Sequence, residues 1–294
     1  MIRLGLVGGA GAYHGRAFSA LINGLAEGQA RPEGWPAFTP QVEGARIVSV
    51  WDPDRGTAEA LAQVFGIARV ADRMEDAADG ADGVIVTDDM TKRHHHRAKP
   101  FLRAGVPTFI DKPLASDVEE AAELVDLAVK HGTPMMSASS LRYAKETEDL
   151  RANPGALGNI LAATAVCRGE LIYYGIHPLE LAVSILGTGV RSVQNVGREG
   201  QNVVQIDYRD GRSLVLIVYA GISSPFQLNL YGDKGWRQVV VTDSAAFYSN
   251  LLGKVAEMCH SKRPPIPYAE TLEIIRILVA AQRSLYEERK VVIG

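Results

Sequence analysis

The sequence predicts two domains of different class. We expect an α/β domain with a parallel, doubly wound sheet over residues 1–138 and an α+β domain with a mainly antiparallel, open sheet over residues 139–294. In the first part, short apolar runs alternate with helical patterns, which is typical of a parallel sheet. In the second part, strand-like runs follow one another across short turns, which is typical of an antiparallel sheet. A length of 294 residues also fits about two domains.

The first domain is expected to contain five strands separated by helices. Phe18, Leu21, Ile22 and Leu25 mark one helical face. Ser116 with Glu119 forms the capping-box pattern that begins a later helix. The stretch from Gly28 to Gly44 is rich in proline and glycine, lacks periodicity and is predicted to be a surface loop. The expected strands are Leu4–Val7, Ile47–Trp51, Val84–Thr87, Thr108–Ile110 and Pro134–Ser137.

The second domain is expected to begin near Ser139 and to contain alternating strands. In "NVVQIDY", Val204, Ile206 and Tyr208 share one face. The run "SLVLIVY" is apolar on both faces, so we predict a central strand whose outer face forms a homo-oligomer contact, in a dimer or tetramer. A last helix is expected at about Glu270–Glu287.

Composition excludes several classes of partner. The formal net charge of −3 gives no electrostatic case for binding nucleic acid or an anionic membrane. No apolar run approaches a membrane span, and the glycine-rich N-terminal run is interpreted as a strand and not as a signal peptide. Cys167 and Cys259 are expected to be buried thiols of a cytoplasmic protein, although one disulfide is possible.

The first expected strand leads into a glycine-rich turn. Gly8, Gly9, Gly11 and Gly15 lie between this strand and a helix expected to begin near Gly15. Glycine lets a phosphate approach the backbone, and the amides at the helix N-terminus favour its negative charge. The turn is about two residues longer than the common G-x-G-x-x-G fingerprint. It therefore suggests a dinucleotide-binding Rossmann domain, although such turns also occur for steric reasons alone.

Asp52 supports the cofactor interpretation. It ends the second expected strand, "RIVSVWD", where an acid in dinucleotide-binding folds accepts hydrogen bonds from the adenosine ribose. A carboxylate there would repel a 2′-phosphate, so NAD is preferred over NADP. Arg55 is the nearby residue that could reverse this preference. An acid in "DPDR" is also common for turn reasons alone.

The stretch "GVPTFIDKPLA", with "VTDDMTKRHHHRAKPFLRAG" before it, resembles the Gfo/Idh/MocA family of NAD(P)-dependent oxidoreductases. These enzymes act mostly on sugars, inositols and related polyols. The family's acid-Lys-Pro signature is matched by Asp111-Lys112-Pro113, and its Thr-Pro-Asn-like turn by Thr87-Asp88-Asp89, where the proline is missing. A lengthened glycine turn occurs in a subset of the family. The resemblance implies that the cofactor is bound by Gly8, Gly9, Gly11, Ala12, Tyr13, Asp52, Thr87, Asp89, His94, Asp111 and Lys112.

The resemblance continues into the second domain. The segment "SLRYA" places Arg142 near the site, and "YYGIHPLELAVSILG" resembles a helix start in which His177 and Glu180 match family positions. The family's catalytic Asp, four residues before the histidine, is Tyr173 here. The resemblance implies that the substrate is bound by Lys112, Arg142, Tyr173, Tyr174 and His177.

Oxidising a secondary alcohol requires a group that accepts the hydroxyl proton while a hydride leaves the same carbon. Lys112, at the carboxyl end of a central strand, and His177, from the second domain, are the candidates for this proton transfer. Tyr173 would share a face with His177 if the helix begins by Tyr173, and its phenol could donate a hydrogen bond. The alternatives are a surface lysine, a helix-start histidine and a packing aromatic.

The triplet His94–His96 raises the question of a metal site. Adjacent helical residues point about 100° apart, so we expect a helix N-terminus there and no metal.

These observations predict an NAD-dependent oxidoreductase acting on a sugar, cyclitol or similar polyol. A non-catalytic NAD-binding sensor or regulatory protein, and a lyase or hydrolase with tightly bound NAD, remain the alternatives.

Overall fold

The computed structural model describes residues 1–89 and 91–293, which form two compact units. The first contains residues 1–115, 119–137 and 248–267, and the second contains residues 116–118, 138–247 and 268–294. Met90, within the stretch that resembles the family, and Gly294, the last residue of the expected second domain, lie outside the described residues.

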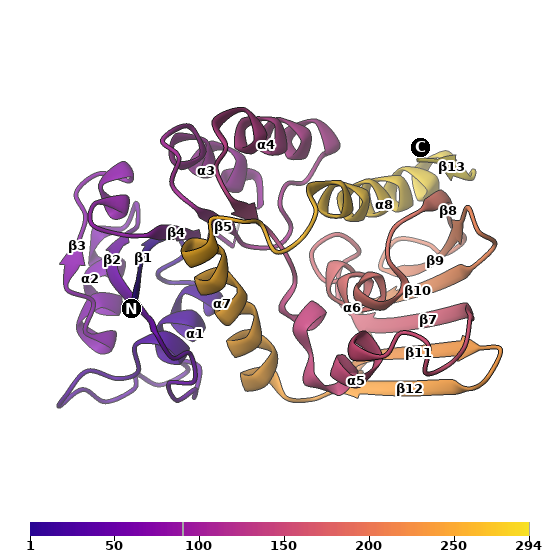
Figure 1. Cartoon of the computed structure of the whole chain (residues 1–294), viewed down its shortest axis with the longest axis horizontal. Coiled ribbons are helices and arrows are strands. Elements are labelled where there is room, and N and C mark those ends of the chain that lie inside the picture. Colours follow the sequence, from indigo (N-terminus) through magenta and orange to yellow (C-terminus); the bar gives the residue numbers. More distant parts are fainter. Residues whose placement is uncertain (90, 294) are drawn as a thin grey trace. The chain divides into compact units, whose positions relative to one another are not determined.

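The first unit is built on a parallel sheet whose strand order is β3-β2-β1-β4-β5-β6 (Figure 1). The doubly wound parallel sheet is thus confirmed, as are the five expected strands. The additional strand β3 has two residues, which is too short to give an alternating pattern. The bounds are β1 Ile2–Val7, β2 Ala45–Trp51, β3 Arg69–Val70, β4 Gly83–Val86, β5 Thr108–Ile110 and β6 Met135–Met136.

The helices of this unit connect its parallel strands. Helix α1 begins at Tyr13, two residues earlier than expected, so Gly15 lies inside its first turn. It ends at Ile22, so the placement of Leu25 on its apolar face is wrong, and Leu25 is exposed. No helix or strand is assigned between Asn23 and Gly44, which confirms the predicted loop. The α-helices are α1 Tyr13–Ile22, α2 Arg55–Phe65, α3 His94–Arg103 and α4 Val118–His131, and the 3₁₀ turns are η1 Glu75–Ala78 and η2 Thr91–Arg93.

Residues 248–267, which the sequence analysis places in the second domain, cluster with the first unit. They include most of α7 (Ser244–Ser261), which lies beside α1 in Figure 1. The Tyr248 ring packs edge-on against Phe18, with 5.9 Å between ring centroids, and is also in contact with Phe38. This aromatic packing gives a physical reason why residues 248–267 belong to the first unit. The sequence pattern of one segment cannot reveal a packing contact with a distant segment.

The second unit contains a sheet of order β12-β11-β7-β10-β9-β8-β13. It is mainly antiparallel, as predicted, with one parallel pair between β7 and β10. The run "SLVLIVY" forms the central strand β10. The strands are β7 Ile160–Arg168, β8 Val190–Asn195, β9 Gln201–Tyr208, β10 Ser213–Tyr219, β11 Phe226–Gly232, β12 Trp236–Val241 and β13 Val291–Val292.

One face of this sheet is buried. Val204, Ile206, Leu214 and Leu216 are fully buried, and their sequence neighbours on the opposite face are partly or fully exposed. Helices α6 (Ile176–Leu186) and α8 (Tyr268–Glu287) pack against the strands. The remaining helical segments are η3 Ser140–Tyr143, η4 Lys145–Thr147 and α5 Glu148–Ala152.

Both cysteines are buried free thiols, one in each unit. Burial raises the pKa of Cys167 to about 12 and that of Cys259 to about 11, which makes both thiols unreactive near neutral pH. In the described part of the chain, no helix has the length and apolar character needed to cross a membrane.

Candidate active site

The glycine turn packs too closely for side chains. Gly8 and Gly9 have φ of 69° and 64°, and a Cβ at Gly9 would lie 2.0 Å from the carbonyl oxygen of Thr87. A Cβ at Gly15 would lie 2.1 Å from the carbonyl oxygen of Gly9, so this glycine lets α1 approach the turn. The N-cap residue of α1, Ala12, makes no side-chain capping bond. The steric reason for these glycines is therefore present in the structure.

A hollow of about 220 Å³ adjoins this turn. Asp52, Asp88 and Asp89 line it, and Arg93 supplies a positive charge. Its lining also includes Gly9, Gly11, Ala12, Pro53 and Thr57. A glycine-lined hollow beside an uncapped helix N-terminus suits a diphosphate, and an acid at the end of β2 suits ribose hydroxyls, so these residues fit NAD.

Asp52 is held in place by backbone amides. Its carboxylate accepts hydrogen bonds from the N–H of Ala10 and of Asp54, both at 3.0 Å. Arg55, the residue that could have favoured NADP, pairs instead with Glu59 at 2.8 Å and Asp72 at 2.5 Å.

The turn after β4 supports the glycine turn from the other side. The Thr87 hydroxyl donates to the carbonyl of Gly8 at 2.7 Å and is fully buried, so Thr87 braces the turn. Asp88 lies 2.7 Å from Nε of the buried Arg97. Burial raises the pKa of Asp88, although Arg97 and His94 oppose this shift. In the sequence, Asp88 stands out only as a departure from the family pattern.

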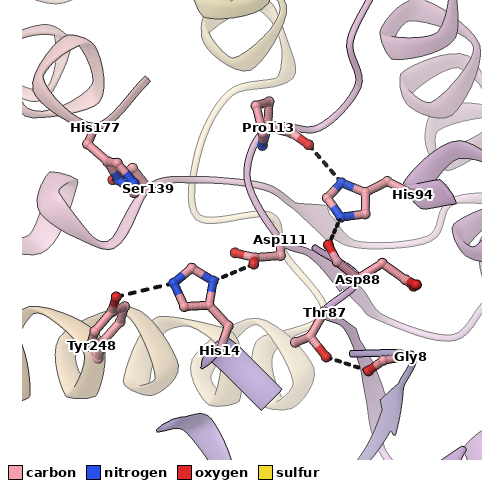
Figure 2. A network of polar contacts seen from close by, with 10 residues as sticks. All are labelled: Gly8, His14, Thr87, Asp88, His94, Asp111, Pro113, Ser139, His177 and Tyr248. Atoms are coloured by element: carbon pink, nitrogen blue, oxygen red, sulfur yellow. Dashed lines mark hydrogen bonds and ion pairs between the residues drawn. The ribbon is translucent and has the colours of Figure 1, made fainter. Parts of the chain in front are cut away.

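His94 is the first residue of α3, as predicted. Its Nδ1 lies 2.8 Å from the carbonyl of Pro113 and its Nε2 lies 2.8 Å from the carbonyl of Asp88 (Figure 2). Both ring nitrogens therefore face the protein backbone. This geometry favours a role in joining the two turns over direct contact with a cofactor.

Asp111 and Lys112 follow β5 directly, and both are about 95% buried, with 4% and 5% exposure. Burial lowers the pKa of the Lys112 ammonium, while the charges of Asp111 and Asp89 act to raise it. Burial would raise the pKa of Asp111, but His14, Lys112 and His94 outweigh it and lower this pKa to about 2. A buried lysine beside a fixed carboxylate is a group whose proton affinity the protein can tune.

The sequence analysis missed His14 and Tyr248. His14 Nδ1 lies 2.5 Å from Oδ2 of Asp111, and its Nε2 lies 3.2 Å from the Tyr248 hydroxyl (Figure 2). The imidazole stacks on Phe18, with 5.1 Å between centroids. Tyr13, a predicted cofactor residue, is 51% exposed at the start of α1. The sequence signal that could have indicated His14 is its position, because it lies in the first helical turn after the glycines.

The second unit holds His177 through a serine. The buried Ser139 hydroxyl lies 2.7 Å from His177 Nδ1 and accepts a bond from the Leu141 N–H at 3.2 Å. The Ser139 hydroxyl can donate to Nδ1 or accept from it, and in both cases the bond orients the imidazole. The ring also packs against Phe226 and Tyr174, at 5.2 and 6.0 Å.

The condition that placed Tyr173 and His177 on one helix face was that the helix begins by Tyr173. It is not met, because α6 begins at Ile176 and Tyr173 lies in the preceding turn. Its ring contacts that of Tyr174 edge-on at 5.5 Å, and both side chains are partly buried.

Arg142 is engaged by two carboxylates of its own unit. Its Nε lies 2.5 Å from Glu180, and a terminal nitrogen lies 2.5 Å from Glu270. Burial would lower the pKa of Arg142, but the two carboxylates raise it above its ordinary value. Burial raises the pKa of Glu180, against the effect of Arg142. These pairings favour a structural role over direct substrate binding.

Among residues 1–89 and 91–293, no group of three or more His, Cys, Asp or Glu side chains could hold a metal ion. His95, from the triplet, pairs with Glu123 at 2.6 Å.

A glycine turn between β1 and α1, an acid ending β2 and a parallel sheet define a dinucleotide-binding Rossmann domain. Residues 2–139 match the family described as oxidoreductases with an NAD-binding Rossmann fold. The resemblance of this domain to the Gfo/Idh/MocA family is thus confirmed over residues 2–139.

Two curated relatives illustrate the similarity. Inositol 2-dehydrogenase 2 of Saccharopolyspora erythraea is 25% identical over 202 residues, which cover 63% of this chain and 59% of the relative. D-glucoside 3-dehydrogenase of Escherichia coli is 30% identical over 170 residues, or 50% of this chain and 48% of the relative. The chain thus spans about half the length of these relatives.

The whole chain resembles solved structures in fold. Myo-inositol dehydrogenase from Lactobacillus casei, in complex with NAD(H) and myo-inositol, has a TM-score of 0.82 at 17% identity. The match covers 100% of this chain and 97% of that structure, so both units share the fold of that protein.

Proposed function

We propose that this protein oxidises a secondary alcohol of a sugar, cyclitol or similar polyol with NAD. The main support is the position of Lys112. This buried lysine follows Asp111 at the carboxyl end of β5, and Rossmann domains bind their ligands at the carboxyl ends of their parallel strands. The named activities of the inositol and glucoside dehydrogenase relatives support this substrate class.

The residues of the first unit would hold the cofactor. Gly8, Gly9, Gly11 and Ala12 would surround the diphosphate, with Asp52 toward the ribose and Asp89 nearby. When bound, the nicotinamide accepts the hydride from the alcohol carbon. The three aspartates of the hollow and the paired state of Arg55 support NAD over NADP. Binding titrations check this preference, and a lower Kd for NADPH than for NADH would contradict it.

Lys112 would accept the hydroxyl proton. Burial lowers its pKa from the ordinary value, so a larger fraction is neutral near pH 7 than for an exposed lysine. We propose that His177 and Tyr173 assist in proton transfer, with Tyr174 contributing to substrate binding. Ser139 would keep the His177 imidazole in one orientation.

The experiment is a panel of inositols, sugars and sugar acids incubated with the protein and NAD. We expect at least one compound to give NADH and a ketone in equal amounts. A protein that binds NADH tightly but turns over no polyol would favour the sensor or regulatory alternative. Product formation without release of NADH would favour the lyase or hydrolase.

A further inference from the structure

We propose that His14 is a positioning residue for Asp111 and Lys112, and that the Tyr248 hydroxyl fixes its imidazole. This inference rests on the proposed function, in which Lys112 transfers the proton. It adds two residues that the sequence pattern did not single out and that act through Asp111.

The contacts form a continuous path from α7 to the strand end. Tyr248 lies in α7, His14 in the first turn of α1, and Asp111 directly after β5. In Figure 2 the imidazole stands between the phenol and the carboxylate, with one ring nitrogen toward each. Stacking on Phe18 holds the ring plane, since the two rings are 10° from parallel.

This path is buried, so each polar group needs its partner. The side chain of Asp111 is 5% exposed and that of His14 is 13% exposed. A carboxylate removed from water and left without its donor becomes costly to ionise. His14 Nδ1 can donate to Asp111 whether the imidazole is neutral or protonated, because Tyr248 can either donate to Nε2 or accept from it.

The charge of Asp111 then acts on the adjacent lysine. The groups that face Asp111 are His14, Lys112 and His94, and those that face Lys112 are Asp111 and Asp89. Without His14, burial would raise the pKa of Asp111, so its carboxylate would be less readily ionised. With less negative charge on Asp111, protonated Lys112 would be less stable and the pKa of Lys112 would be lower. The limb of the pH profile that reports Lys112 should therefore move to lower pH.

Two substitutions separate positioning from packing. His14→Asn keeps a donor near the position of Nδ1, whereas His14→Phe keeps a stacked ring and loses the donor. We expect His14→Phe to lower kcat by about tenfold or more and to shift the Lys112 limb downward, whereas His14→Asn stays within about threefold of the native kcat. The kcat of Tyr248→Phe should lie between those of His14→Phe and His14→Asn. His95→Asn, on the same domain, is the matched histidine control.

A readout that needs no turnover separates this inference from the proposed function. The carboxyl carbon of Asp111, followed by NMR in ¹³C-aspartate-labelled protein and assigned with Asp111→Asn, should titrate at higher pH in His14→Phe than in native protein or His14→Asn. Failure of every polyol would leave this result standing. An unchanged Asp111 titration in folded His14→Phe would overturn the inference. Equal losses of kcat in the two His14 variants would also overturn it.

Discussion

At the scale of single residues, Lys112 carries the proposed chemistry. Because a general acid–base group typically contributes about 10²–10⁴-fold, Lys112→Ala should lower kcat by that amount. NADH binding should change little, since the glycine turn and Asp52 would make the main cofactor contacts. Steady-state kinetics and fluorescence titration measure the two effects. Lys130→Ala, an exposed lysine of α4, is the control, and a loss below about fivefold in Lys112→Ala would mean that Lys112 is structural.

Asp52 is the residue that tests cofactor choice. Asp52→Asn keeps an acceptor for the Ala10 N–H while removing the charge that would repel a 2′-phosphate. We expect the ratio of Kd for NADPH to Kd for NADH to fall by about tenfold, in line with the strength of charge-assisted hydrogen bonds. The exposed Asp126→Asn serves as the control. An unchanged ratio would show that Asp52 does not select the cofactor.

Local sequence patterns identified part of this site and missed the rest for a physical reason. Gly8, Gly9 and Asp52 stand at fixed places relative to strand ends, so a pattern within one segment reveals them. The contact between His14 and Tyr248 joins residues 234 positions apart, which no local pattern contains. Arg142 could be placed in the second domain from the sequence, but its pairing with Glu180 and Glu270 depends on tertiary packing.

At the scale of elements, the charged cluster of Arg142, Glu180 and Glu270 ties η3 to α6 and α8. Arg142→Met leaves two carboxylates without their cation, which should lower the free energy of unfolding by about 3–5 kcal/mol. Arg237→Met, which breaks an exposed pair with Asp149, should cost less than about 1 kcal/mol. Urea denaturation measures both. A stable Arg142→Met with only a raised KM would instead restore Arg142 as a substrate ligand.

The loss in Arg142→Met should depend on pH. Burial raises the pKa of Glu180, and the variant lacks the guanidinium that opposes this shift. A raised carboxyl pKa means that the folded chain holds a proton that the unfolded chain has released above about pH 4.3. Stability therefore falls as pH rises through the folded value, and the deficit should be larger at pH 8 than at pH 5. A deficit that shrinks with rising pH would contradict this assignment.

Helices and strands with a regular repeat of apolar residues could be predicted from the sequence. The residues at which they begin and end could be predicted less well. β9 was recognised because apolar and polar residues alternate along it, and β10 because its seven residues form an apolar run on both faces. The start of α6 could not be fixed from the sequence, because the residues of the turn before it are as apolar as those of the helix. α7 was not predicted. Its residues from Tyr248 onward belong to the first unit, where the Tyr248 ring contacts His14 and Phe18 of α1.

At the scale of the whole molecule, the outer face of the second sheet bears on assembly. Ile217 is paired in register with Val203 and Val166, and all three are only partly buried, while Trp236 is 70% exposed. We predict a homo-oligomer, a dimer or tetramer, that buries this face. Light scattering should show it at micromolar concentration, and Ile217→Glu should reduce its mass. Gln63→Glu, at an exposed site of α2, should leave the mass of the oligomer unchanged. A native protein that is monomeric would contradict the prediction.

The central claim is net hydride transfer from a polyol carbon to NAD. It is tested most directly with the best substrate of the panel carrying deuterium on the carbon to be oxidised. Mass spectrometry of the released cofactor should find one deuterium in NADH for each ketone formed. Product that retains its deuterium, with no net reduction of NAD, would contradict the account and indicate a transient oxidation.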